Sequence, residues 1–514
     1  MAARLAALAM CSGVTAGAQT MPAPQPTPAV IKLPALPAVV VTLPKPGPSS
    51  VIHLSYAAPA PQPAPSAPTP PTAAPPVATT PVPAAPPVAA LPADPQIVAA
   101  LAALPSLHHP LGRALLARTY GNFREAVGQQ YALGGQQPIF MASAAARPPQ
   151  WSAAARSLAQ RLLLASHDGI DLSQTPVPDM NLAPSGAADV ALTAAVLNYA
   201  WQAQGGRVNP RFISRFVELR PTIVPPSDVL AHVKAAGIVA GATLQQINPH
   251  QSGYQRLRTD LITRLAQRPA DTGEALKQWR AARNGLVVNM EFWRWQQAAT
   301  GAAQIVVNVP AFTLRLRKDG HTVMTRKVIV GKSATPTPLL NSKIQYIIIN
   351  PSWHVPQSII KKDFIPKLEA NPDYLAERGF DVRVSDGHLI VKQPPGPRNA
   401  LGLIKFIFPN DQSVYLHDTS ERRLFSNRVR AFSHGCVRLQ EPFSLASALL
   451  GAKWSQKRLE SMVGSKEHYL RFGEVVPIQI EYFTIYAENN GKLEQFADLY
   501  GYARKVQAAL GLRT

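Results

Sequence analysis

The residues best suited to chemistry in this chain gather around one cysteine near its C-terminal end. The motif Ser433-His434-Gly435-Cys436 contains that cysteine, and His417 precedes it by nineteen positions. A cysteine is a useful nucleophile only as the thiolate, so it needs a base or a positive charge nearby. Gly435 permits close backbone approach to a substrate carbonyl, and amides in such a turn can stabilise an oxyanion. The pattern predicts acyl transfer on Cys436, with His417 as the base.

Two other roles for Cys436 stay open at the level of residue types. Free cysteines are often buried as small apolar side chains, so a structural thiol is one alternative. A zinc site formed with His417 and His434 is another, although the chain lacks the paired cysteine spacing of most zinc sites. We predict no metal and no organic cofactor.

The first twenty residues are typical of a secretory signal. Arg4 supplies a positive start, and Leu5–Met10 form an apolar run that is too short to span a bilayer. Ala16-Gly17-Ala18 is a cleavage site of the A-x-A type, so the predicted signal peptide is 1–18. We therefore expect export to the periplasm, with cleavage near Ala18.

Cleavage at that point would remove Cys11 and leave Cys436 as the single thiol. One remaining cysteine excludes a disulfide framework, and a lone thiol in an oxidising compartment is a liability unless it has a function. Lipidation of Cys11 is an alternative, although the bulky Met10 before it disfavours that modification.

The chain carries a net charge of +21, from 51 Lys and Arg against 30 Asp and Glu. Excess positive charge favours association with polyanions. No Lys/Arg run, zinc finger, RNP or KH pattern occurs, so we predict no nucleic-acid partner. Weak association with an anionic wall or membrane surface fits the charge better.

Composition divides the chain into segments. Between Pro22 and Pro95 lie 24 of the 51 prolines, so we predict that 19–95 is a disordered Pro/Ala-rich linker, with a bias to extended polyproline II. From 96 to 300, Leu, Ala and Val recur at three- and four-residue intervals, which predicts helices. One helix is expected to begin at Asp189 as N-cap and to end at Gly205-Gly206.

Two neighbouring histidines, His108 and His109, fall in the helical region. No acidic residue or cysteine stands at metal-ligand spacing from them, so we interpret them as ordinary surface or core residues.

From 301 to 485 the pattern changes to strands. Residues 304–317 predict one strand that pairs with 321–331 through a turn at Asp319-Gly320. Further strands are expected at KIQYIIINPSW, SVYLHD and VPIQIEYFTIYAE. The Pro-, Gly- and Asn-rich segment 355–401 is predicted to be an inserted lid, and 486–514 a C-terminal tail with a helix.

His417, the fifteen residues 418–432 and then Ser-His-Gly-Cys-Val-Arg resemble the signature of YkuD-type L,D-transpeptidases, in the form of the YcbB-like branch. VNVPAF, VGKSATPTP, NPSWHVP, QPPGPRNALG, KFIFPN and SVYLHDT resemble segments of that branch in the same order. The resemblance implies an α+β chain: a helical scaffold domain (96–300), then a β-rich catalytic domain (301–485) with the lid inserted.

Two departures from the family pattern stand out. Many members have Asn two residues after the cysteine, where this chain has Arg438. YcbB-like proteins also carry a peptidoglycan-binding helical module before the catalytic domain, and the thirty residues 265–294 are too few for it. Anchoring to the wall would then depend on the linker or on the basic charge.

The resemblance also implies a reaction. Cys436 would attack the third residue of a donor tetrapeptide stem of peptidoglycan and expel the terminal D-Ala, and an amine of a second stem would resolve the thioester into a 3–3 cross-link. His417 would take the proton, the lid would exclude water, and carbapenem-type inhibitors would acylate the same thiol.

The remaining roles follow from the same resemblance. His434 would help the turn amides to hold the oxyanion. Roles in holding the oxyanion or orienting the catalytic groups fall to Gly435, Asp418 and Ser433. The residues predicted to line the groove are Tyr415, Trp353 and Arg438. For Tyr415 and Trp353, ordinary core positions are the alternative.

The motif does not show which acceptor resolves the thioester. An L,D-carboxypeptidase, an amidase of stem peptides and an enzyme that attaches proteins to the stem would all use the same residues. A wall-binding protein that keeps the fold without activity is an alternative of another class. Acylation of Cys436 would distinguish an enzyme from a binding protein.

Overall fold

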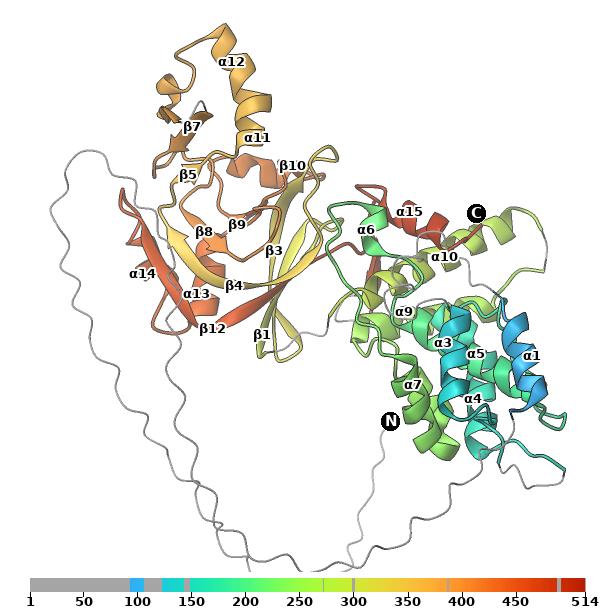
Figure 1. Cartoon of the computed structure of the whole chain (residues 1–514). Coiled ribbons are helices and arrows are strands. Elements are labelled where there is room, and N and C mark those ends of the chain that lie inside the picture. Colours follow the sequence, from blue (N-terminus) through green and yellow to red (C-terminus); the bar gives the residue numbers. More distant parts are fainter. Residues whose placement is uncertain are drawn as a thin grey trace, which may run out of the picture. The chain divides into compact units, whose positions relative to one another are not determined.

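The computed structural model describes residues 93–105, 123–142, 148–270, 272–297, 301–385, 388–487 and 491–513. The predicted signal peptide, most of the predicted linker, and His108 and His109 lie outside these ranges. The first part of the described chain is helical and the second part is rich in strands (Figure 1). Within the described ranges, no helix is both long enough and apolar enough to cross a bilayer.

The helical region packs around one central helix, α5 (Gly186–Ala203), which is buried along nearly its whole length. Helices of this region surround it: α1 (Pro95–Ala103), α3 (Phe123–Leu133), α4 (Ala153–Leu163), α7 (Pro226–Ala235) and α8 (Ala240–Gln245). A short helix α6 (Pro210–Ile213) follows α5. Alanines along α5 let its neighbours approach closely, because a small side chain leaves room for the facing helix.

The start of α5 differs from the prediction. Ser185 is the N-cap, with its side chain accepting from the amide of Ala188, and Asp189 lies one turn further in. Asp189 is fully buried and accepts hydrogen bonds from the amides of Ile139 and Phe140. The prediction was wrong because an acidic residue near a helix start can serve a tertiary contact as well as a cap.

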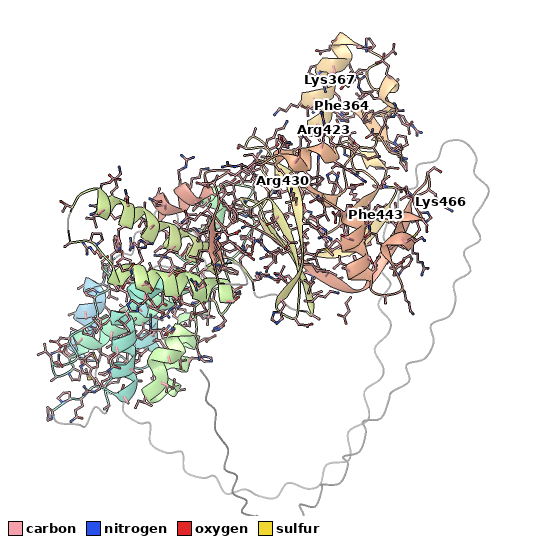
Figure 2. The ribbon with its side chains drawn as sticks, turned by 180° about the vertical axis from the view of Figure 1, so that it is seen from behind. Phe364, Lys367, Arg423, Arg430, Phe443 and Lys466 are labelled. Carbon is pink, nitrogen blue, oxygen red and sulfur yellow. The ribbon has the colours of Figure 1, made fainter. Side chains whose placement is uncertain are left out.

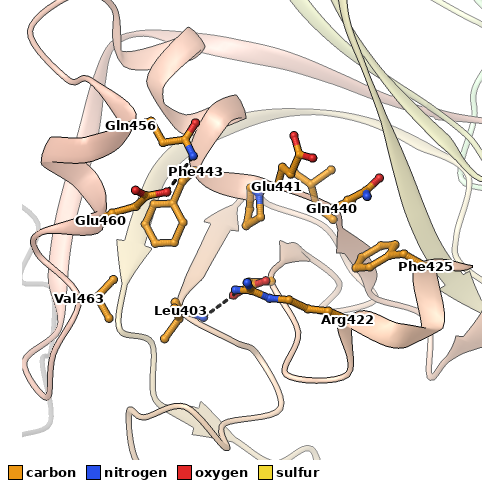
Figure 3. A pocket seen from close by; sticks show the side chains of 12 residues that line it. Leu403, Arg422, Phe425, Gln440, Glu441, Phe443, Gln456, Glu460 and Val463 are labelled. Carbon is orange, nitrogen blue, oxygen red and sulfur yellow. Dashed lines mark hydrogen bonds and ion pairs between the residues drawn. The ribbon is translucent and has the colours of Figure 1, made fainter.

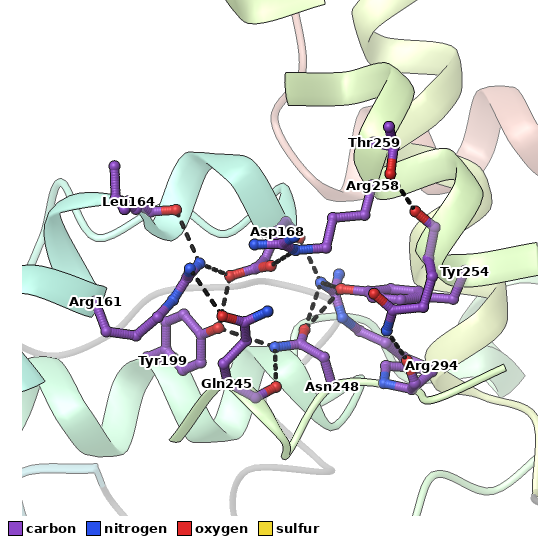
Figure 4. A network of polar contacts seen from close by, with 12 residues as sticks. Arg161, Leu164, Asp168, Tyr199, Gln245, Asn248, Tyr254, Arg258, Thr259 and Arg294 are labelled. Carbon is purple, nitrogen blue, oxygen red and sulfur yellow. Dashed lines mark hydrogen bonds and ion pairs between the residues drawn. The ribbon is translucent and has the colours of Figure 1, made fainter. Parts of the chain in front are cut away.

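A buried charge network crosses the helical region (Figure 4). The carboxylate of Asp168, with no exposed surface, accepts from Arg161, from Arg258 Nε at 2.7 Å and from the Tyr199 hydroxyl at 2.6 Å. Arg294, the last residue of α10 (Glu274–Arg294), donates to the Asp168 backbone carbonyl. The network therefore joins α4 and α5 to α10 and to α9 (Ser252–Ala266), which carries Arg258. Because these groups are desolvated, each charge depends on its partners.

Two helices belong to the core of the strand region. In α9 (Ser252–Ala266) and α10 (Glu274–Arg294), buried side chains pack in one hydrophobic cluster with the strands. Residues 265–294 were predicted to be too few for a peptidoglycan-binding module, and α10 accounts for most of them. The helical and strand-rich parts are thus continuous through a shared core across the predicted boundary at 300.

The strands form a nine-stranded mixed sheet in the order β10-β3-β11-β9-β8-β4-β12-β1-β2, and β2 pairs back onto β3, so the sheet closes on itself. Its strands are β1 (Ala303–Asn308), β2 (Thr313–Lys318), β3 (His321–Gly331), β4 (Leu340–Ile349), β8 (Ile404–Ile407), β9 (Leu416–His417), β10 (Ala431–Ser433), β11 (Val437–Leu439) and β12 (His468–Glu481). The enclosed side is filled by Ile, Val and Leu.

The predicted strand 304–317 is in fact two strands. β1 ends at Asn308 and β2 begins at Thr313, with Phe312 in the left-handed region at φ 53°. Pro310 in this turn lacks an amide and cannot continue a ladder. The predicted turn at Asp319-Gly320 is present. Both residues have positive φ, the backbone conformation that a tight two-residue hairpin turn requires.

The insertion is a small subdomain with its own core. It contains a three-stranded sheet, β5 (Trp353–His354), β7 (His388–Gln393) and β6 (Asp381–Ser385), and the helical turns α11 (Gln357–Ile359), η3 (Ile360–Phe364) and α12 (Ile365–Ala370). Figure 1 shows it rising from the barrel beside β10. We call residues 353–393 the lid.

After β11 the chain forms α13 (Pro442–Leu450) and α14 (Gln456–Glu460). The predicted tail contains the end of the strand pair β13 (Ile485–Ala487) and β14 (Leu493–Gln495), followed by α15 (Tyr502–Ala509). Tyr502 and Val506 of α15 are buried in the core cluster shared with the barrel. This end of the chain is therefore part of the packed domain.

Candidate active site

The nucleophile motif forms a tight turn between β10 and β11. Gly435 adopts φ 122°, which L-residues rarely reach. The Ser433 hydroxyl donates to the carbonyl of Cys436 at 2.5 Å and accepts from the amide of Gly435 at 3.1 Å. Ser433 is thus buried inside the turn and fixes its shape.

A second layer supports this turn from the loop after β3. The Thr337 hydroxyl donates to the Gly435 carbonyl and accepts from the Gly331 amide, both at 2.8 Å. Tyr500, from the predicted tail, donates to the Gly331 carbonyl at 2.7 Å and accepts from the Thr337 amide at 3.2 Å. The conformation of the turn is therefore determined by residues far away in the sequence.

Strand pairing brings His417 to the turn. β9 and β11 are parallel, and His417 stands opposite Arg438, two residues after Cys436. Arg430 holds the returning segment, because its guanidinium donates to the carbonyls of Val328, Asn427 and Phe312. Figure 2 labels Arg430 in the strand region. The intervening residues therefore fold back as the sequence motif requires.

His417 is 4% exposed, and its ring Nδ1 lies 2.5 Å from the carbonyl oxygen of Asp418. Burial lowers the pKa of His417 to about 3, and the charges of Arg438 and Lys405 act in the same direction. The ring is therefore neutral at physiological pH. With Nδ1–H donating to Asp418, Nε2 is left as the basic nitrogen.

The side chain of Asp418 binds groups other than the His417 ring. Its carboxylate accepts from the Leu403 amide at 3.0 Å and from Arg422 at 3.4 Å. Figure 3 shows the pocket of about 520 Å³ that it helps to line behind the catalytic strands, with Leu403 and Arg422 in view. These bonds hold the backbone that carries His417, whose ring interacts with the backbone of Asp418 and of Leu401.

Cys436 is half-buried. Burial raises the pKa of its thiol, and the Tyr415 amide, the Lys405 charge, the Tyr415 hydroxyl and the Arg438 charge oppose that rise. The raised pKa means that the sulfur needs help from a base to become a thiolate. The neutral ring of His417 lines the same cleft and is the candidate for that base.

Lys405 is a residue that the sequence interpretation did not assign. It stands opposite His417 in the β8–β9 pair, and its Nζ lies 3.6 Å from the centroid of the Tyr415 ring. Burial lowers the pKa of Lys405, while Cys436 and Glu467 raise it. The alternating pattern of KFIFPN is compatible with a half-buried lysine, but it does not indicate what the amine faces.

His434 faces the lid. Its Nε2 lies 3.1 Å from a carboxylate oxygen of Asp363 in η3. Burial lowers the pKa of His434, Asp363 opposes this effect, and Lys332 and Lys362 add to it. The oxyanion role of this ring stays a prediction. The structure adds a link to the lid, a contact that no local motif could indicate.

The predicted groove residues have different settings. Arg438 donates to Glu421 at 2.6 Å. Trp353 packs against Phe364 and Phe380 of the lid, so it contributes to the lid core as well as to the groove. Phe364 is labelled on the lid in Figure 2. The Tyr415 hydroxyl interacts with the side chains of both Cys436 and Trp353.

All these groups meet in one cleft of about 680 Å³ between the barrel and the lid. Its lining includes Cys436, His417, His434, Ser433, Tyr415, Trp353 and Arg438. The lid contributes Lys362, Asp363, Phe364 and Lys367. Gly435 and Asp418 shape the cleft from behind it. In the described part of the chain, no group of three or more His, Cys, Asp or Glu side chains is arranged to hold a metal ion.

The barrel and this cleft define a β-rich catalytic domain with a cysteine and two histidines at its centre. Residues 302–457 match the family model described as the L,D-transpeptidase catalytic domain (YkuD), and residues 125–261 match the Scaffold domain. The chain therefore combines a region similar to the L,D-transpeptidase catalytic domain (YkuD) with a region similar to the Scaffold domain, an arrangement of the YcbB-like kind. The predicted α+β fold class is confirmed.

A curated relative from Haemophilus influenzae, named "Putative L,D-transpeptidase", is 33% identical over 226 residues. The match covers 40% of this chain and 45% of the relative, so less than half of the relative's length is represented.

Solved structures give weaker matches. An L,D-transpeptidase from Mycobacterium smegmatis is 16% identical, with a TM-score of 0.20 over 35% of this chain and 58% of that one. The catalytic domain of the E. faecium L,D-transpeptidase acylated by ertapenem is 13% identical, with a TM-score of 0.20 over 36% of this chain and 99% of that one. Scores this low do not support a comparison of the sites.

Proposed function

We propose that this chain is a peptidoglycan L,D-transpeptidase that forms 3–3 cross-links through a thioester on Cys436. The main support is the cleft in which the half-buried thiol and the neutral ring of His417 lie together. The match of residues 302–457 to the L,D-transpeptidase catalytic domain supports peptidoglycan stem peptides as the substrate class. No metal or organic cofactor takes part in the proposed reaction.

In the first step, Cys436 Sγ bonds to the carbonyl carbon of the third residue of a donor stem, while its proton passes to His417 Nε2. The amides of Gly435 and Cys436 would hold the oxyanion. As the tetrahedral intermediate collapses, the C–N bond breaks and the imidazolium proton leaves with the amine of D-Ala. This yields a thioester and a neutral imidazole.

In the second step, an amine of another stem attacks the thioester carbonyl and gives its proton to His417, and the proton then passes to the departing sulfur. The amide cross-link replaces the thioester, and Cys436 returns as a thiol. The lid would keep water from competing with the amine. Its contact with the nucleophile turn, His434 to Asp363, gives it a place to close.

The cleft fits an acidic peptide, since Lys332, Lys362 and Lys367 line it. Carbapenem-type inhibitors are proposed to acylate the same sulfur. We further propose that the protein acts after export to the periplasm, where the wall substrate lies.

Intact mass of the purified chain, incubated with a disaccharide tetrapeptide or a carbapenem, tests the covalent step. We expect an adduct on the wild-type chain and none on Cys436→Ala. Ser461→Ala, a change in an exposed loop residue outside the cleft, is the control and should label normally.

Muropeptide analysis of sacculi treated with the enzyme identifies the acceptor. Cross-linked dimers through the third residue support the proposal, tripeptides alone would indicate an L,D-carboxypeptidase, and protein-linked stems would indicate attachment activity. Dimers formed by Cys436→Ala would refute the role of the thiol.

A further inference from the structure

Lys405 lies where a cation can act on the nucleophile without touching the substrate. Its Nζ is 3.6 Å from the centroid of the Tyr415 ring, and its position on β8 is opposite His417. The Tyr415 ring in turn meets the His417 ring edge to face at 5.6 Å. A cation held over an aromatic face is attracted by the ring, more strongly where water is excluded.

Tyr415 connects this cation to the sulfur. Both residues line the same cleft, and the amide of Val437, next to Cys436, donates to the Tyr415 carbonyl at 3.1 Å. From this position the Tyr415 hydroxyl lowers the pKa of the Cys436 thiol. A hydrogen-bond donor is strengthened when a positive charge polarises the group that carries it. The arrangement is therefore a short relay from ammonium to phenol to sulfur.

Other charged groups near the thiol are already occupied. Arg438 on β11 is bound by Glu421 at 2.6 Å. His434, from the turn, faces Asp363 of the lid. The His417 ring on β9 is neutral, and Lys332 and Lys362 are exposed side chains at the cleft mouth.

The acid that faces Lys405 is itself bound elsewhere. The two carboxylate oxygens of Glu467, ahead of β12, accept from the Ser352 amide at 2.6 Å and from the Tyr469 hydroxyl at 2.8 Å. Cys436 raises the pKa of Lys405 more than Glu467 does, so the positive charge of Lys405 acts on the sulfur as well as on this carboxylate.

We propose that Lys405 is a positioning residue for the nucleophile: through the face of Tyr415 it directs the tyrosine hydroxyl onto Cys436 Sγ and stabilises the thiolate that forms when His417 takes the proton. The inference rests on the proposed function, since it assigns a role within that site. The only proton that moves is the one that passes from sulfur to imidazole.

The test is the pH profile of Cys436 alkylation by iodoacetamide in the full chain, followed by peptide mass. We expect Lys405→Met to move the midpoint up by about one pH unit and to slow alkylation at neutral pH about tenfold, because the reagent reacts with the thiolate. Lys405→Arg should restore the profile. Lys343→Met is the matched control: it removes the same charge from an exposed site on the adjacent strand β4 and should leave the profile unchanged.

A double-variant cycle tests the relay. In a Tyr415→Phe background, Lys405→Met should add little further shift, because the hydroxyl that it acts through is gone. A full additional shift would overturn the relay. If Lys405→Met does not fold, as judged by circular dichroism, Lys405→Gln gives the same comparison with a polar side chain.

Alkylation needs neither donor stem nor acceptor, so the two proposals can fail separately. If the midpoint shifts in Lys405→Met but the wild-type chain forms no cross-links, the proposed function is rejected and the role of Lys405 in tuning the thiol stands. An unshifted midpoint for Lys405→Met in a folded, cross-linking enzyme would overturn this inference alone.

Discussion

His417 and Arg438 are register partners on the parallel strands β9 and β11. Because Cys436 is two residues before Arg438, this pairing brings the predicted base, His417, and the predicted nucleophile, Cys436, to the same part of the sheet. It also places a guanidinium near the imidazole, where it helps to keep the ring neutral.

The low pKa of His417 predicts an unusual pH profile. An imidazole with an ordinary pKa would lose its basic form below about pH 6.5, whereas this ring, with a pKa of about 3, stays neutral well below that. Acylation of Cys436 by a carbapenem should therefore keep its rate from about pH 8 down to about pH 4, and fall only below that. Stopped-flow measurement of the acylation rate against pH checks this.

Circular dichroism at each pH separates loss of base from loss of fold. An acid limb near pH 6.5 in a chain that is still folded would contradict the assignment of a buried neutral base. His417→Asn, which keeps a hydrogen-bonding side chain but no base, should slow acylation about 100-fold or more between about pH 4 and pH 8.

Asp363→Asn should loosen the lid. The change removes the charged partner of His434, so the lid loses a direct contact with the nucleophile turn. Water would then compete better for the thioester, and the ratio of hydrolysed tripeptide to cross-linked dimer should rise severalfold. Muropeptide chromatography measures this ratio.

Asp381→Asn is the control for this change, since it removes one exposed charge from lid strand β6. Equal product ratios for both variants would mean that the lid charge, and not the contact with His434, controls access.

Thr337→Val should damage the turn more than the fold. Its hydroxyl bridges the Gly435 carbonyl and the Gly331 amide, and valine leaves both buried groups without that partner. We expect a loss of about 1–3 kcal/mol in the free energy of unfolding, with a larger proportional loss of acylation rate. Urea titration and carbapenem acylation measure the two effects.

Thr325→Val, at an exposed position on β3, should change neither quantity. If Thr337→Val lowered stability but left the acylation rate intact, Thr337 would be a purely structural residue.

Asp168→Asn should destabilise the scaffold. The buried carboxylate forms ion pairs with Arg161 and Arg258, and removing its charge leaves both guanidinium groups without their anion. Breaking such a pair costs about 3–5 kcal/mol, and denaturant unfolding measures it. Asp260→Asn, which removes the partly exposed pair with Arg256, should cost less than about 1 kcal/mol. Equal effects would show that burial does not matter to this network.

Local patterns were sufficient to predict part of this molecule. The fold class followed from the change of hydrophobic period near 300, and the hairpin at Asp319-Gly320 followed from its turn residues. The signature around Cys436 predicted, without any tertiary information, the catalytic domain that residues 302–457 match. Each of these features is encoded within a few neighbouring residues.

The missed features depend on contacts between distant segments. Lys405 meets Tyr415, and Asp363 meets His434, only because of strand register and the packing of an insertion. Asp189 was taken for a cap because a buried carboxylate and a capping carboxylate look alike in sequence. Pro310 did carry a signal for the break between β1 and β2, since a proline cannot donate to a central ladder.

The hydroxyl of Tyr500 makes the shape of the nucleophile turn depend on a segment outside the barrel strands. Tyr500 bonds to Gly331 and Thr337, and Thr337 in turn bonds to Gly435. A protein cut ahead of Tyr500 would therefore keep the thiol of Cys436 and lose part of the support that shapes the loop around it.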